Sequence, residues 1–230
     1  MVNCGIIFRA SIIAVLFGSG FVACRPKTQS NIGADVHGVT QQSPKPCKWN
    51  YFEDPSLNWT KEEKAEIEKV KSEILKTYGI VMKSGERSWS LDELKIVETI
   101  LPKVPLSFAK YTKAFVRGLS GGSTAVLGFM EKSDEITIYE SAMCDMEETV
   151  VHEMGHAFAN ANPAIFDAWK QQFWKDPAKP SGSPTDYGKT NSDEDFAESV
   201  EWTVLKPDVF LQQDSARVAF IRKNVLLLHP

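Results

Sequence analysis

The chain has 230 residues, of which 43% are apolar and 24% are charged. That composition suits one globular domain with its own core and excludes a disordered chain or two large domains. Lys and Arg number 26 against 30 Asp and Glu, and the net charge of -4 argues against a general nucleic-acid-binding protein. Four Cys and four His are too few for a disulfide scaffold or a zinc-finger array.

Residues 1–23 predict a bacterial signal peptide. Arg9 is the only charged side chain in this segment, and the apolar run that follows is shorter than the 20 or so residues that span a bilayer. A charged start, a short apolar run and a small residue before a cleavage site are typical of secretion signals. We therefore expect the mature chain to be exported.

The end of this segment resembles the lipobox of bacterial lipoproteins. Residues 21–24 read Phe-Val-Ala-Cys, and only Phe21 departs from the usual Leu. The resemblance implies that Cys24 is lipidated and anchors the protein in the cell envelope. Arg25 in place of Asp favours the outer membrane of a Gram-negative source. Ordinary secretion with a free Cys24 is the alternative.

Residues 24–50 are rich in Pro, Gln and Ser and show no apolar periodicity, so we expect a flexible tether. The folded domain is then expected over residues 51–230. In an exported protein disulfides persist, and Cys47 and Cys144 are the two thiols left after cleavage and lipidation. We expect them to pair, with two unpaired cysteines as the alternative.

Two capping-box patterns predict helices in the first part of this domain. The first begins after Thr60 and ends near Tyr78, and the second begins after Ser90 and ends near Leu101. A third helix is expected over residues 106–116.

A strand pair is expected next. Residues 118–122 form a turn-rich connection without the ending of a phosphate-binding loop. Residues 125–130 and 135–139 read as strands, with a polar turn over residues 132–134 between them.

Residues 152–156 read His-Glu-Met-Gly-His, the H-E-x-x-H pattern of a zinc hydrolase helix. At about 100° per residue, with His152 at zero, His156 falls near 40° and Glu153 near 100°. Gly155 adds no side chain beside the metal. The apolar positions fall together between about 140° and 260°, and they are Val150, Val151, Met154, Ala157, Phe158 and Ala161. One face is therefore expected in the core and the other facing a cleft with the two zinc ligands. A solvated polar face with two ordinary histidines is the alternative.

A catalytic zinc has three protein ligands, so a third is needed. The remaining histidines, His37 in the tether and His229 near the end, are unsuited to that place. Glu194 and Glu198 lie one helical turn apart, which suits one carboxylate on the metal and the other accepting a hydrogen bond from a ligating imidazole. A solvated helix face is the alternative for this pair.

Residues 187–191 (Tyr-Gly-Lys-Thr-Asn) and 194–198 (Glu-Asp-Phe-Ala-Glu), with the zinc helix, resemble the catalytic domain of the anthrax-toxin lethal factor family. The resemblance implies an α+β, zincin-like peptidase domain, in which a small sheet with an edge strand packs on helices that carry the ligands. By position, Glu194 matches the zinc ligand and Glu198 the acidic residue that supports it. Tyr187 matches the active-site Tyr that stabilises an oxyanion or assists the leaving group. The likeness does not transfer a host target.

The expected function is that of a zinc metallopeptidase, a hydrolase that cleaves peptide bonds with one Zn²⁺ per chain. Zinc lowers the pKa of a water molecule towards about 7, and Glu153 accepts the proton as general base and passes it to the departing amine. By the resemblance, strand 135–139 pairs with substrate as an edge strand, although an interior strand is equally open. Trp169, Phe173 and Trp174 are expected in the core, with a substrate subsite as the second choice.

Two rival functions stay open. One is a zinc hydrolase acting on a non-peptide amide, and the other is a non-catalytic, zinc-stabilised binding lipoprotein. Glu153 argues against the second, because a structural zinc site needs no base. The expected partners are a peptide or protein substrate and a membrane reached through the lipid, but no nucleic acid.

Overall fold

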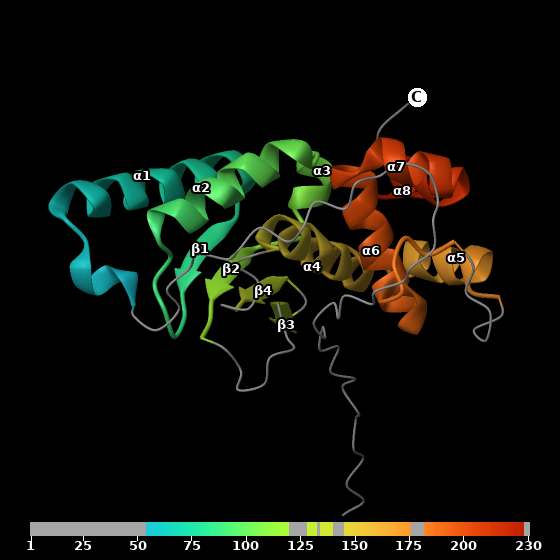
Figure 1. Ribbon diagram of the computed structural model, residues 1–230, viewed down its shortest axis with the longest axis horizontal. Coiled ribbons are helices and arrows are strands. Elements are labelled where there is room, and N and C mark those ends of the chain that lie inside the picture. Colours follow the sequence, from blue (N-terminus) through green and yellow to red (C-terminus); the bar gives the residue numbers. More distant parts are fainter. Residues whose placement is uncertain (1–53, 120–127, 133, 140–144, 176–181, 228–230) are drawn as a thin grey trace, which may run out of the picture.

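The computed structural model describes residues 54–119, 128–132, 134–139, 145–175 and 182–227, with only the backbone described over 128–132. These residues form an α+β fold that is mostly helical and holds one small sheet (Figure 1). The predicted signal peptide and tether, and the cysteines Cys24, Cys47 and Cys144, lie outside the described residues. Within the described part of the chain, no helix is long and apolar enough to span a bilayer.

Both predicted capping boxes are present. The Thr60 hydroxyl accepts a hydrogen bond from the Glu63 amide at 3.1 Å, and the Glu63 carboxylate accepts one from the Thr60 amide at 2.8 Å. Ser90 and Glu93 make the same reciprocal pair. They open helices α1 (Lys61–Tyr78) and α2 (Leu91–Ile100), and short 3₁₀ turns η1 (Pro55–Asn58) and η2 (Leu101–Lys103) flank them.

The sheet has four strands in the order β1-β2-β4-β3. Strands β1, β2 and β4 are parallel, and β3 runs antiparallel to β4. The bounds are β1 (Val81–Ser84), β2 (Ala114–Arg117), β3 (Gly128–Lys132) and β4 (Glu135–Ile138). The predicted pair of strands is therefore confirmed, with β3 displaced towards the turn.

Two expectations are wrong. The helix predicted over residues 106–116 is only the short α3 (Leu106–Ala109), and β2 takes up the rest. Phe115 and Val116 are good strand formers, and Phe115 is fully buried between strands on both sides. The second is the edge position that the resemblance implies for the strand at residues 135–139, for which an interior position was equally open. β4 lies between β2 and β3, so the interior position is confirmed, and β1 and β3 form the two edges of the sheet.

The second half of the fold is helical, and its first helix, α4, contacts β3, β4 and α2 of the first half and α5 and α6 of the second (Figure 1). The bounds are α4 (Met146–Ala161), α5 (Pro163–Phe173), η4 (Gly188–Thr190), α6 (Ser192–Leu205), α7 (Pro207–Gln213) and α8 (Ser215–Asn224).

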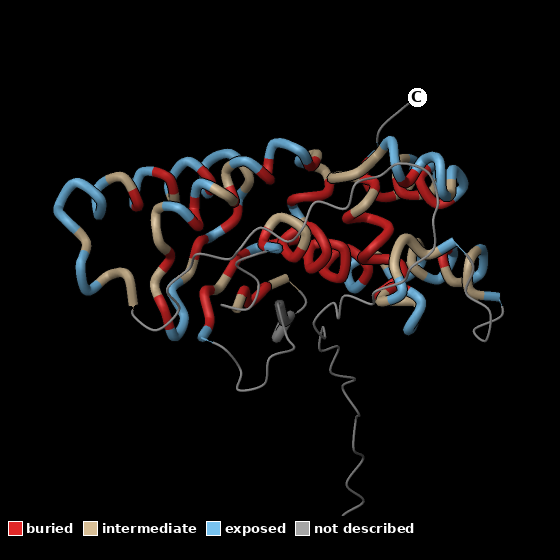
Figure 2. Tube along the Cα trace, in the orientation of Figure 1, coloured by how far each residue is buried: buried red, intermediate tan, exposed pale blue. Residues whose placement is uncertain are grey.

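Helix α4 is buried on both of its faces (Figure 2). Its apolar face enters the core as expected, but its polar face packs against α6 rather than standing open. Asp145 occupies the N-cap position, but its side chain accepts no capping hydrogen bond from the first turn of α4, and Glu148 pairs with Lys206 at 3.5 Å. Trp169 of α5 is fully buried, with Phe173 and Trp174 packed on the same core, as predicted.

Candidate metal centre

Helices α4 and α6 approach each other closely at Gly155. A Cβ atom on Gly155 would lie 3.0 Å from the Cα of Ala197 and 3.4 Å from its Cβ. Glycine is therefore needed here because a larger residue would push the two helices apart. The sequence had suggested a different reason, the space that glycine leaves beside the metal. The close approach brings the polar face of α4 against the first turns of α6.

Asn191 fixes where α6 begins. Its side-chain oxygen accepts hydrogen bonds from the amides of Asp193 at 3.0 Å and Glu194 at 2.9 Å. These bonds satisfy two amides that the helix itself leaves unpaired. The last residue of the Tyr-Gly-Lys-Thr-Asn run thus places Glu194 in the first turn of α6, opposite the two histidines of α4.

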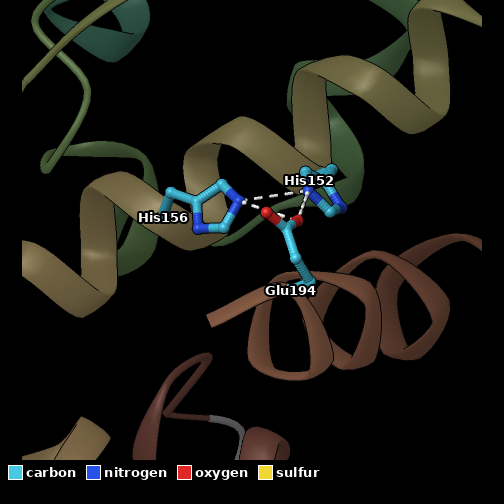
Figure 3. A group of neighbouring side chains, drawn as sticks. All are labelled: His152, His156 and Glu194. Carbon is cyan, nitrogen blue, oxygen red and sulfur yellow. Dashed lines mark hydrogen bonds and ion pairs between the residues drawn. The ribbon is translucent and has the colours of Figure 1, made fainter. Parts of the chain in front are cut away.

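Three ligand atoms converge between the helices (Figure 3). His152 Nε2 lies 3.0 Å from Glu194 Oε2 and 3.1 Å from His156 Nε2, and His156 Nε2 lies 3.4 Å from Glu194 Oε2. Zinc–ligand bonds of about 2.0–2.1 Å at a tetrahedral angle separate neighbouring ligand atoms by about 3.3–3.4 Å. The three separations agree with that value to within about 0.4 Å, so these buried groups could hold a metal ion.

The Glu194 carboxylate is held in its charged form. Burial alone would raise the pKa of this carboxyl, since only 2% of the residue is exposed. Hydrogen bonds from His152 and His156, together with their charges, outweigh the burial and hold the pKa far below its usual range. Ligation requires the deprotonated carboxylate, which this arrangement favours.

Two carboxylates face the other nitrogen of His152. Glu198 Oε1 lies 3.4 Å from His152 Nδ1, which is the place expected for Glu198, and Glu201 Oε2 lies 3.8 Å away. Both glutamates are fully buried. Together with His152 they form a second group of potential ligand atoms. Glu201 is absent from the sequence prediction, although it continues the face of Glu194 and Glu198 at helical spacing.

Glu153 directly follows His152 in α4 and is buried, with 2% of its surface exposed. Its Oε1 atom has no hydrogen-bond partner among the described residues. A buried carboxylate oxygen normally has a partner, and an exception calls for an unseen water molecule or a functional reason. The residue predicted as general base thus carries an unsatisfied acceptor at the position after His152 in α4.

Tyr187 stands at the start of η4, and its ring centre lies 6.0 Å from that of His152. The sequence brings this residue to the site as expected, and it is partly exposed. The turn also contributes a contact that the sequence did not predict, because the Thr185 hydroxyl donates a hydrogen bond to Glu198 Oε2 at 2.7 Å.

A scan against protein-family models finds no match for this chain, and a search of curated proteins finds none either. The function of the protein is therefore inferred from the geometry of the described residues.

Proposed function

We propose that this protein is a zinc-dependent endopeptidase with a zincin-like domain, exported and anchored by a lipid on Cys24. One observation carries the proposal. The ligand atoms of His152, His156 and Glu194 converge at tetrahedral spacing, and Oε1 of the buried Glu153, which directly follows His152, has no hydrogen-bond partner among the described residues. A purely structural metal site needs the first feature but not the second.

Two imidazoles and one carboxylate are a donor set typical of catalytic zinc, which leaves a fourth position open. The same set also suits non-haem Fe²⁺, so the metal is an outcome to be measured. When bound, zinc supplies a Lewis acid that polarises a carbonyl and lowers the pKa of water towards about 7.

The residues of the chain then take separate tasks. Glu153 accepts the proton of the attacking water and delivers it to the departing amine. The Tyr187 hydroxyl donates a hydrogen bond to the developing oxyanion, a contact worth about 2.7–4 kcal/mol in other hydrolases. Glu198 fixes the orientation of the His152 ring from the side opposite the metal.

The test is cleavage of a peptide library by the zinc-loaded protein, with and without a chelator. We expect chelator-sensitive cleavage that Glu153→Gln abolishes while zinc content is retained, because an amide cannot accept the proton. Tyr187→Phe is expected to lower kcat more than it raises KM. Glu147→Gln is the matched control, since Glu147 lies on the same helix but its side chain is 45% exposed and pairs with Lys103.

Each rival function predicts a different result. Cleavage of simple amides but not of peptides would favour the non-peptide amidase. A zinc-loaded protein that cleaves neither would favour the binding lipoprotein. Wild-type turnover by Glu153→Gln would refute the mechanism.

The anchor is tested separately. Cys24→Ser is expected to move the protein out of the membrane fraction. An unmodified Cys24 in a soluble wild-type protein would contradict lipidation.

A further inference from the structure

Thr185 connects two parts of the candidate site. Its hydroxyl donates to Glu198 Oε2 at 2.7 Å and accepts from the amide of Gly188 at 3.0 Å. The other oxygen of Glu198, Oε1, faces His152 Nδ1 at 3.4 Å. One side chain therefore joins the backbone of the turn that carries Tyr187 to the carboxylate behind His152.

The donor and acceptor roles of the Thr185 hydroxyl in these two hydrogen bonds are linked. A hydroxyl has one proton, and giving it to Glu198 leaves the oxygen lone pairs for the Gly188 amide. A bond to a carboxylate is shorter and roughly twice as strong as one between neutral groups. Thr185 thus holds the turn in one orientation relative to Glu198.

The packing of the turn agrees with this connection. A Cβ atom on Gly188 would lie 3.4 Å from the Cβ and Cγ of Glu198, and it would collide with the Ser183 hydroxyl. The turn is anchored at its start as well, where Gly182 has φ +84° and a Cβ would collide with Asp214 and Arg217. The backbone on both sides of Tyr187 is therefore closely packed, against α6 at Gly188 and against the start of α8 at Gly182.

We propose that Thr185 is a positioning residue that couples the Tyr187 turn to the metal-binding imidazole of His152 through Glu198. The proposal rests on the proposed function and deepens it. Because coupling between two binding events is reciprocal, zinc binding also tightens the turn, and loosening the turn weakens zinc binding.

The experiment compares Thr185→Val with Thr185→Ser. Valine keeps the size of threonine but removes both hydrogen bonds, whereas serine keeps the hydroxyl. Thr190→Val is the control, since among the described residues Thr190 donates to the Tyr187 carbonyl within the same turn and has no bond to Glu198. Three quantities are measured for each variant: zinc affinity, amide hydrogen exchange over residues 183–190 with and without zinc, and kcat and KM on a cleaved peptide.

For Thr185→Val we expect zinc affinity to fall about 10-fold, near the lower end of the 10–100-fold found for residues that orient a metal ligand. The zinc-dependent protection of residues 183–190 should disappear, and kcat should fall with little change in KM. Thr185→Ser should stay within about twofold of wild type in zinc affinity, and Thr190→Val should keep wild-type zinc affinity.

Two outcomes overturn the proposal. In the first, Thr185→Val keeps both wild-type zinc affinity and zinc-dependent protection. In the second, Thr185→Ser loses as much zinc affinity as Thr185→Val, which would mean that the hydroxyl and its two hydrogen bonds do not by themselves support zinc binding. If the wild-type protein binds zinc but cleaves no peptide, the proposed function fails alone, since affinity and exchange still test the coupling. A change in the thermal midpoint of the zinc-free variants identifies a general folding defect.

Discussion

Replacing Gly155 with alanine tests whether the distance between α4 and α6 sets the metal site. The new Cβ would meet the Cα of Ala197 at 3.0 Å, whereas carbon atoms in contact lie about 3.5–4.0 Å apart. The shortfall is about 0.5–1 Å, and a backbone Cα cannot rotate out of the way. The helices must therefore separate or bend at this point.

Two effects on stability oppose each other. Overpacking of this kind costs about 1–3 kcal/mol, and the better helix propensity of alanine returns about 1 kcal/mol. We expect the free energy of unfolding of the zinc-free protein to fall by about 0–2 kcal/mol. Zinc–ligand distances tolerate only about 0.2 Å, so the same displacement of Glu194 should weaken zinc binding by on the order of 10–100-fold.

The assay is zinc competition with a chromogenic chelator, together with urea unfolding of the zinc-free protein. Gly79→Ala is the matched control, because its φ of +72° strains an alanine but no atom lies within 4 Å. It should lose about 1–2 kcal/mol of stability and keep its zinc affinity. In Gly155→Ala/Ala197→Gly the obstructing Cα remains, so zinc affinity should recover only in part. Wild-type zinc affinity in Gly155→Ala would refute the reasoning.

Two further predictions concern the carboxylates. Glu194→Ala should lower zinc affinity more than Glu198→Ala, for which we expect about 10–100-fold, and the reverse order in metal analysis would exchange their roles. The pKa of Glu194 is lowered from its ordinary 4.5, so its carboxylate stabilises the zinc-free protein fully above that pH and progressively less as the pH falls below it. The difference in the free energy of unfolding between wild type and Glu194→Gln should shrink over that acidic range, and a pH-independent difference would contradict the assignment.

Local patterns in the sequence were sufficient for the elements that hold the site. Capping residues such as Thr60 and Ser90 act within four residues of themselves, so the sequence shows them directly. Helical spacing predicts that His152 and His156 share a face, and it pairs Glu194 with Glu198. The resemblance to the lethal factor family then selects Glu194 as the ligand of that pair. The structure brings His152, His156 and Glu194 together, while zinc binding itself stays a prediction.

The rest depends on contacts between distant segments. The residues of β2 predict a helix as readily as a strand, because a short apolar run has no distinct period. Pairing with β1 and β4, which come from other parts of the chain, makes this run a strand. The bond from Thr185 to Glu198 joins a turn to a helix through side chains alone. Gly155 could be given its packing role only once Ala197 was known to lie against it.

The buried Arg217 of α8 is a further contact of this kind, and it holds the start of α6. Its guanidinium donates to Asp195 Oδ2 at 3.0 Å and to Asp214 Oδ2 at 2.7 Å. Asp195 also accepts a hydrogen bond from the Trp174 indole at 2.7 Å. Asp195 directly follows Glu194, so this network supports the turn that carries Glu194.

Substitutions at Arg217 and at Asp195 should lower the free energy of unfolding by different amounts. Breaking a buried ion pair costs about 3–5 kcal/mol when it leaves a charge uncompensated, and Arg217→Met would leave Asp195 with only the Trp174 indole. Asp195→Asn keeps an acceptor for Trp174 and leaves Arg217 paired with Asp214, so we expect a smaller loss of about 1–2 kcal/mol. Urea unfolding of the zinc-free variants measures both. A loss from Asp195→Asn as large as that from Arg217→Met would mean that Asp195 alone accounts for the effect of Arg217, because Asp195→Asn leaves the pair with Asp214 in place. No loss from Asp195→Asn would mean that Asp214 carries the pairing and that Arg217 does not hold the start of α6.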